Sequence, residues 1–294
     1  MGPGTRVLLA WCVIALLGAS CHGMNFENDF NVLWQAENNI LAQNTAESVD
    51  LTLTKAGGAN FESSQPYLYG SFSVRIKLVP GESAGTVAAF YLMSFTDYHD
   101  EIDFEFLGNE TGQPYTLHTN IFVNGTGGRE QRVKLWFDPT ADFHTYKVVW
   151  NHYQVLWLVD EIPIRFYRNL EHIYPGSYPH FQPLVVSACL FDGSLWATQD
   201  GTKPVLWDHA PFTVKFRNFQ FEACKVPRGT DPRACNKDYE GNWWEGVYYH
   251  SLDQSRRDQL MWVTANWKIY DYCYDTKRYV PMPLECEYNV PWVW

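Results

Sequence analysis

Hydrophobic and polar residues alternate with a period of two along much of the chain, the pattern of a β-strand with one buried face. In residues 71–78, four apolar residues alternate with serine, arginine and lysine, which predicts an antiparallel strand with one face toward water. Asp160 and Glu161 separate two such runs and are expected to form a hairpin turn. Similar runs span residues 86–93, 116–123, 132–137, 145–150, 154–159, 184–190 and 213–222. They predict an all-β fold, a two-sheet β-sandwich of the jelly-roll, concanavalin-like type.

The pattern changes after Cys224. A capping box runs from Ser251 to Gln254, and apolar Leu260 and Val263 follow at helical spacing. We therefore predict a helix with Ser251 as its N-cap. It belongs to a C-terminal extension at residues 223–294, which packs on a jelly-roll domain at residues 24–222.

The first 23 residues resemble a secretory signal peptide. Arg6 precedes an apolar run at residues 7–17, and small residues follow. The alternative, a membrane anchor, needs ~20 apolar residues, which this run does not reach. Sequons at Asn109 and Asn124 also suit glycosylation of an exported chain. We expect a secreted protein that acts outside the cell.

Composition narrows the class of partner. The 294 residues include 33 acidic and 22 basic ones, for a formal net charge of −11. This balance argues against nucleic acid or an acidic membrane surface as the partner. Aromatic residues make up 17% of the chain, and such rings either fill a β core or stack on a flat neutral ligand.

Five cysteines follow the signal segment. The spacing of the last four favours local pairing, Cys224 with Cys235 and Cys273 with Cys286, among three possible connectivities. Cys189 lies in an apolar run and is expected to be a buried free thiol. Because no Cys-x-x-Cys pair occurs, a zinc site has little support.

The most informative segment is the acidic strand at residues 99–109. In a strand, Glu101, Asp103 and Glu105 share one face with His99, while the apolar residues between them share the other. Three carboxylates in a row repel one another and raise at least one pKa. Two glutamates whose carboxyls approach ~5 to 5.5 Å are the machinery of a retaining glycosidase. The alternatives are a solvated acidic face or a calcium site built from the same carboxylates.

The acidic strand resembles the catalytic signature of the plant xyloglucan endotransglucosylase/hydrolases, in glycoside hydrolase family 16. The resemblance covers nearly all of the chain after residue 23. Further matching segments are residues 79–87, 129–132, 135–140, 143–146, 196–198 and 272–279.

The resemblance implies a role for individual residues. Glu101 would be the nucleophile, Asp103 its helper and Glu105 the general acid/base, with a glycosylated Asn109 beside them. For Trp196 the alternative is plain packing. The implied glucan contacts are His118, Thr119, Asn120, Gly128, Arg129, Glu130, Trp196 and Arg278, where the alternative for Arg278 is a surface ion pair with Asp275.

Some positions depart from the family pattern. Ser194 and Leu195 stand where the family commonly has two acids, and Asp200 replaces a glycine. Residues 55–63, which the resemblance places beside the donor side of the cleft, also differ. The donor therefore stays open between xyloglucan, mixed-linkage glucan and cellulose.

The expected activity is that of a secreted retaining endotransglucosylase. It would cleave a β-1,4-glucan backbone through a glycosyl-enzyme intermediate and transfer the glycosyl group to another glucan chain, as a monomer and without a metal or organic cofactor. One rival is a predominantly hydrolytic endoglucanase. Another is a lectin-like binding module, but a pure binder has no need for three mutually repelling acids.

Overall fold

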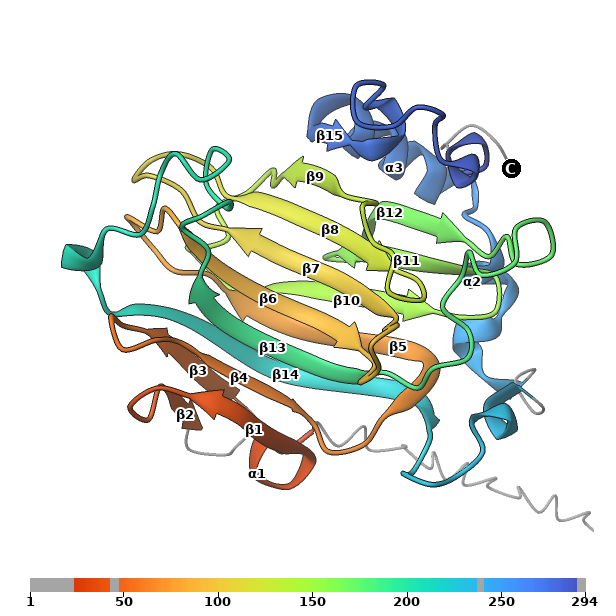
Figure 1. The fold of residues 1–294 in the computed structure, drawn as a ribbon, viewed down its shortest axis with the longest axis horizontal. Helices are drawn as coiled ribbons and strands as arrows, with labels where there is room; N and C mark the ends of the chain where they lie inside the picture. Colours follow the sequence, from red (N-terminus) through yellow and green to blue (C-terminus); the bar gives the residue numbers. More distant parts are fainter. Residues whose placement is uncertain (1–23, 43–47, 237–240, 290–294) are drawn as a thin grey trace, which may run out of the picture.

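The computed structural model describes residues 24–42, 48–236 and 241–289, so the signal segment lies outside the described residues. Two antiparallel sheets lie face to face (Figure 1). The first has eight strands, in the spatial order β1 (Phe30–Gln35), β4 (Ala59–Ser63), β13 (Val185–Asp192), β6 (Thr86–Met93), β7 (Glu101–Leu107), β8 (Thr116–Phe122), β9 (Gln131–Lys134) and β15 (Lys268–Asp271).

The second sheet has seven strands and packs under the first. Its order is β12 (Ile162–Arg168), β11 (Gln154–Val159), β10 (His144–Trp150), β5 (Tyr67–Lys77), β14 (Phe212–Lys225), β3 (Ser48–Leu53) and β2 (Ile40–Ala42). The helices are α1 (Phe26–Asp29), α2 (Val247–His250) and α3 (Gln254–Asn266), with 3-10 turns η1 (Trp207–His209), η2 (Pro232–Asn236), η4 (Trp243–Glu245), η5 (Tyr272–Tyr274) and η6 (Leu284–Glu287). The predicted two-sheet sandwich is confirmed.

The core lies between the two sheets and fixes the orientation of the acidic strand. The apolar residues of β7, Ile102, Phe104 and Phe106, are all fully buried. The Phe106 ring meets the edge of Tyr146 on β10 of the opposite sheet, with centroids 4.6 Å apart. Because successive side chains of a strand alternate, the acidic residues of β7 must face outward from the sandwich.

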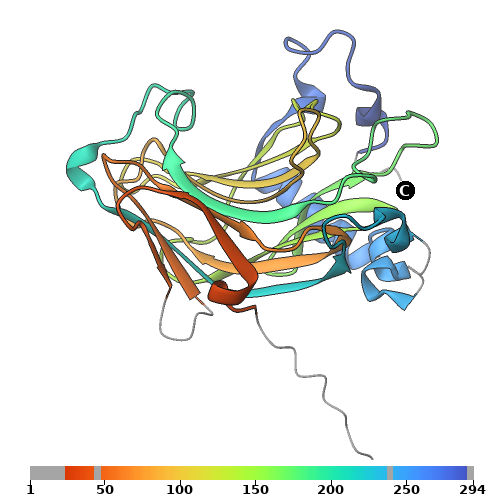
Figure 2. The same cartoon turned by 60° about the horizontal axis from the view of Figure 1, so that its bottom comes forward.

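The outward face of the eight-stranded sheet is the inside of a curve. Figure 2 shows the segment that follows β13 and the C-terminal extension rising on either side of this face. We call this surface the cleft face.

Several sequence predictions match the structure closely. The runs at 86–93 and 154–159 coincide with β6 and β11. Asp160 and Glu161 form the expected hairpin turn, and both adopt positive φ, at 47° and 65°.

One local prediction was wrong, and another holds only in part. The helix α3 is capped by Asp253, whose side chain accepts a hydrogen bond from the Arg256 backbone N–H, so Ser251 is not its N-cap. The polar face of residues 71–78 is open to water only in part, since Arg75 and Lys77 are partly exposed but Ser71 and Ser73 are buried.

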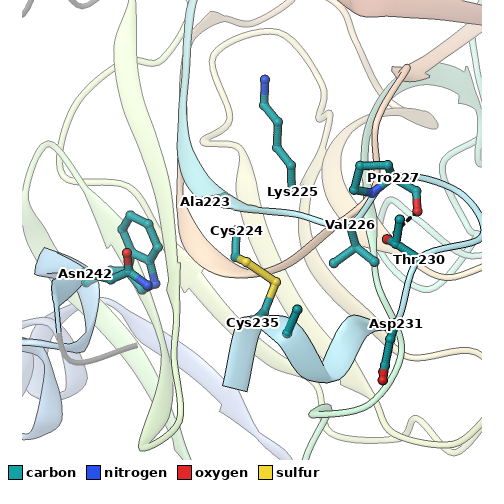
Figure 3. A pocket seen from close by; sticks show the side chains of 11 residues that line it. Ala223, Cys224, Lys225, Val226, Pro227, Thr230, Asp231, Cys235 and Asn242 are labelled. Carbon is teal, nitrogen blue, oxygen red and sulfur yellow. Dashed lines mark hydrogen bonds between the residues drawn. A yellow bond between two sulfur atoms is a disulfide. The ribbon is translucent and has the colours of Figure 1, made fainter. Parts of the chain in front are cut away.

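The extension is tied down by two disulfides, which have the predicted pairing, Cys224 with Cys235 and Cys273 with Cys286. Figure 3 shows the first of these beside a hollow of about 540 Å³ formed by the end of β14, η2 and the segment around Trp244. The extension also supplies β15, which pairs with β9 at the edge of the eight-stranded sheet. Among the described residues, no helix is both long and apolar enough to span a bilayer.

Candidate active site

The three acids lie in the middle of the cleft face, because the eight-stranded sheet has four strands on one side of β7 and three on the other. Asp103 is 4% exposed, and the side chains of Glu101 and Glu105 are 20% and 22% exposed. The acidic row is therefore largely buried, which contradicts the alternative of a solvated acidic face.

Burial and mutual repulsion change the ionisation of this row. Burial raises the pKa of Glu105 to about 7, with a further increase from the charge of Glu101. Burial also raises the pKa of Asp103 well above its usual range, and the charges of Glu101 and Glu105 raise it further. A hydrogen bond with Glu101 acts in the same direction, so Asp103 holds the proton that the two groups share.

Two histidines flank the row. His99 Nε2 lies 3.2 Å from Glu101 Oε2, and His118 Nδ1 lies 3.8 Å from Glu105 Oε2. Burial lowers the pKa of His118 to about 4, and the charge of Arg132 lowers it further. His118 is therefore a neutral ring beside Glu105 at physiological pH.

A hollow of about 410 Å³ opens above the acids. Its lining includes Tyr91, His99, Phe122, Cys189 and Phe191 together with the three acids. Cys189 is a free, buried cysteine as predicted. Because burial raises its pKa, the thiol stays protonated and unreactive where it lines the hollow.

Strand β8 carries the next group of predicted contacts. His118 and Asn120 lie opposite Glu105 and Asp103 in the strand register and share the cleft face. Thr119 lies opposite Phe104, points into the sandwich and is 1% exposed. Its side chain cannot reach a ligand in the cleft, which corrects the expectation from the resemblance.

The segment Gly128–Glu130 is held by the extension. The Tyr279 hydroxyl donates a hydrogen bond to the Gly128 carbonyl, and Arg129 Nε lies 2.7 Å from Glu285 Oε1. The Arg278 guanidinium makes two hydrogen bonds to the Glu130 carboxylate, at 2.7 and 3.0 Å.

These contacts revise the alternatives for Arg278. Its side chain does not pair with Asp275, which instead accepts a hydrogen bond from the Arg278 backbone N–H at 3.1 Å. The Arg129 side chain is committed to Glu285 and is largely buried, so it supports the cleft wall.

Trp196 lies in the segment that follows β13. Its ring is half-buried against a small apolar cluster that includes Leu107 and Ala197, and it stands edge-on to the His118 ring at 6.2 Å. Trp196 therefore packs against the protein and still keeps part of its ring exposed. Asp200 adopts a φ of 53°, which a glycine would adopt without strain, and its carboxylate lies 3.4 Å from Arg132 Nη1.

Sequence reasoning missed a buried cation beneath the row. Arg165 on β12, in the opposite sheet, is 2% exposed and donates to the Thr119 carbonyl and hydroxyl at 2.8 and 2.9 Å. It also lies over the Trp157 ring, whose Nε1–H donates to the Asp103 carbonyl. The charge of Arg165 lowers the pKa of Asp103, opposing burial and its carboxylate neighbours. No local signal marked Arg165, because its contacts cross between sheets.

The remaining site predictions concern glycosylation and metals. Asn109 follows the acidic strand, and its Nδ2 donates to the Pro114 carbonyl at 3.0 Å, while Asn124 is exposed in a tight turn. Within the part of the chain that the structure describes, no cluster of three or more histidine, cysteine or acidic side chains is arranged to hold a metal ion.

Comparison with known proteins agrees with this geometry. Residues 26–209 match the model of the glycosyl hydrolases family 16, and residues 239–286 match that of the xyloglucan endo-transglycosylase (XET) C-terminus. The probable xyloglucan endotransglucosylase/hydrolase protein 7 of Arabidopsis thaliana is 44% identical over 266 residues, covering 90% of this chain and 89% of its own. Protein 9 of the same series from that plant is 42% identical over 284 residues, or 96% of each chain.

Solved structures share the fold. The Bacillus licheniformis beta-glucanase has a TM-score of 0.52 at 24% identity, covering 70% of this chain and 90% of its own. An apo Crh5 transglycosylase has a TM-score of 0.54 at 18% identity, covering 70% and 82%. With a family model over most of the chain and relatives above 40% identity along nearly its whole length, the chain belongs to the xyloglucan endotransglucosylase/hydrolases of glycosyl hydrolases family 16.

Proposed function

We propose that the protein is a secreted, retaining xyloglucan endotransglucosylase. The observation that carries the proposal is the acidic row of β7, in which Glu105 shares a strand face with Glu101 and burial raises the pKa of Glu105 to about 7. The two glutamates therefore have different surroundings, which lets Glu105 act as the general acid and Glu101 as the nucleophile.

The chemistry follows in two steps. Glu101 attacks the anomeric carbon of a backbone glucosyl residue while Glu105 gives its proton to the departing glycosidic oxygen. Glu105, now ionised, takes the proton of an incoming hydroxyl, which displaces Glu101 and restores both groups. Asp103 holds the shared proton beside Glu101, which orients the nucleophile and limits the charge of the row.

The outcome depends on the incoming hydroxyl. Transfer prevails when a bound sugar chain presents its hydroxyl at high effective concentration, and hydrolysis prevails when water competes successfully. His118, Asn120, Glu130, Trp196 and Arg278 are the residues we assign to glucan binding at this face. Gly128 and Arg129 shape the wall that carries them.

The setting of the reaction is also part of the proposal. The pattern of residues 1–23, the sequons at Asn109 and Asn124 and the two disulfides all suit an exported chain that acts in the cell wall. We assign a monomer that acts on polysaccharide donors and acceptors, with no requirement for a cofactor.

The test is a transfer assay on the purified protein. Xyloglucan is incubated with a labelled oligosaccharide acceptor, and label in the polymer is followed together with new reducing ends. We expect labelled polymer with few new reducing ends, and loss of both in Glu101→Ala while its circular dichroism and secretion stay unchanged. Reducing ends without label would show a hydrolase, and full activity in Glu101→Ala would refute the assignment.

The donor needs a parallel experiment, because residues 55–63 and Asp200 depart from the family pattern. Mixed-linkage glucan and a soluble cellulose derivative replace xyloglucan in the same assay. We expect the highest transfer rate with xyloglucan, and a higher rate with either substitute would reassign the donor.

A further inference from the structure

One line of residues crosses the cleft face from the catalytic row to the far edge of the sheet. In-register partners on neighbouring strands share a face, and they connect Glu105 to Ala89, Cys189, Asn60 and finally Trp34. Trp34 lies on β1, which is the edge strand of the eight-stranded sheet. The line is perpendicular to the strands.

The backbone of β1 is adapted to this placement. A β-bulge between Val32 and Trp34 shifts the register, so that Trp34 rather than Leu33 comes opposite Asn60. Val32 keeps the register of Phe61, which faces the core. The bulge therefore turns the indole onto the cleft face.

The surroundings of Trp34 fit a ligand better than a packing role. Trp34 is 45% exposed, so much of its indole is open to a ligand. The next residue in the line, Asn60, has its amide oriented by a 2.7 Å hydrogen bond from Nδ2 to the Tyr91 hydroxyl. Asn60 Oδ1 has no hydrogen-bond partner among the described residues.

The distance suits a chain of sugars. From β7 to β1 the line takes four strand steps, or about 19 Å at ~4.8 Å per step. An extended β-1,4-glucan advances by about one strand spacing per glucosyl unit, so roughly its fourth unit would reach Trp34. Residues 55–63, which include Asn60, border the donor side according to the family resemblance.

We propose that Trp34 is a stacking platform for a distal glucosyl residue on the donor side of the cleft. The inference rests on the proposed function and adds a binding position to it. An indole offers a flat apolar face to the apolar face of a neutral pyranose without any charge, which suits an uncharged polysaccharide. The position would discriminate long donors from short ones.

The test compares Trp34→Ala and Trp34→Phe with donors of two lengths. With polymeric donor we expect kcat/KM to fall about five- to tenfold in Trp34→Ala and to recover largely in Trp34→Phe. With a donor that has only three backbone residues on the donor side, all variants should match the unmodified protein. Equal losses on both donors, or no loss on either, would overturn the proposal.

The matched control is Trp243→Ala. Trp243 is another half-exposed indole, 40% exposed, and its Nε1–H donates to Glu222 at the end of the seven-stranded sheet, away from the cleft face. The same substitution there should leave both donor lengths unaffected. A similar loss in Trp243→Ala would attribute the effect to general destabilisation and overturn the proposal.

A binding experiment separates this inference from the proposed function. In the Glu101→Ala background, affinity electrophoresis measures retardation by xyloglucan, mixed-linkage glucan and hydroxyethylcellulose, with and without Trp34→Ala. We expect weaker retardation by the preferred glucan when Trp34 is absent, even if turnover proves hydrolytic. Unchanged retardation, or a self-association that disappears in Trp34→Ala, would refute the platform while leaving the activity assignment intact.

Discussion

Glu105 is a residue whose buried position favours catalysis and lowers the stability of the fold. Its carboxyl is placed between Ala89 and His118 on neighbouring strands, where water is largely excluded and other acids are close. Burial raises its pKa from 4.5 to about 7. The raised pKa keeps the proton that the reaction needs, and ionisation in the folded state then costs stability as the pH rises.

We expect Glu105→Gln to stabilise the fold in a pH-dependent way. Below about pH 4.5 the carboxyl is protonated in both states, so the substitution changes little. Between about 4.5 and 7 the unfolded chain ionises first, and above 7 the folded protein bears the full cost. Calorimetry should therefore show a Tm gain of more than about 2 °C at pH 7.5 and almost none at pH 4.5.

The same variant should lose transfer activity by ~10²–10⁴-fold, because the leaving oxygen has no proton donor. An aryl glycoside donor, whose leaving group needs no proton, should restore much of the first step. A Tm gain that is independent of pH would contradict the assigned ionisation, and full activity on the polymer would contradict the assigned role.

At the scale of elements, the extension acts as a support for the cleft wall. The strand β15 pairs with β9, and the Cys273–Cys286 disulfide joins η5 to η6. Arg278 lies between these two turns and Glu285 lies within η6, and both residues hold the segment Gly128–Glu130. The other disulfide lies at the end of β14, beside the hollow of Figure 3.

Removing each disulfide should therefore have a different effect. Either pair of Cys→Ser changes should lower the free energy of unfolding by about 2–4 kcal/mol, because each disulfide closes a loop and so limits the conformational entropy of the unfolded chain. Loss of Cys273–Cys286 should also raise KM for the acceptor, whereas loss of Cys224–Cys235 should leave kinetics per folded molecule unchanged. Urea unfolding and steady-state assays measure the two effects. Equal kinetic losses in both variants would argue against a supporting role for the second disulfide.

At the scale of the whole molecule, the net charge of −11 and the neutral substrate are compatible. The acids that matter for chemistry are clustered on one strand, and the cations Arg132, Arg165 and Arg278 surround that cluster. Long-range attraction therefore contributes little to capture of an uncharged glucan.

We expect transfer to be insensitive to ionic strength. Between ~20 and ~300 mM sodium chloride, kcat/KM with a neutral glucan should change by less than about twofold, because no substrate charge is screened. Polygalacturonate at equal mass should not compete. Strong salt dependence or competition by the acidic polymer would contradict a neutral ligand.

The amino-acid sequence by itself determined the local features of this protein. The period of two placed Glu101, Asp103 and Glu105 on one face of a strand. The short spacings between cysteines indicated the disulfide pairing. Each of these features depends only on residues that are close in the chain. Thr119 shows that a role implied by family resemblance can fail at a single residue. Its place in the alternation of β8 directs its side chain into the core, so it cannot contact a glucan in the cleft.

Only the tertiary structure decided which distant residues meet. Arg278 with Glu130, Arg165 beneath Asp103 and Trp34 in line with the acids all depend on strand order and register. Register is fixed by packing between sheets and by a bulge, which no single segment specifies. The same packing set the pKa values, because burial depends on every strand around the row.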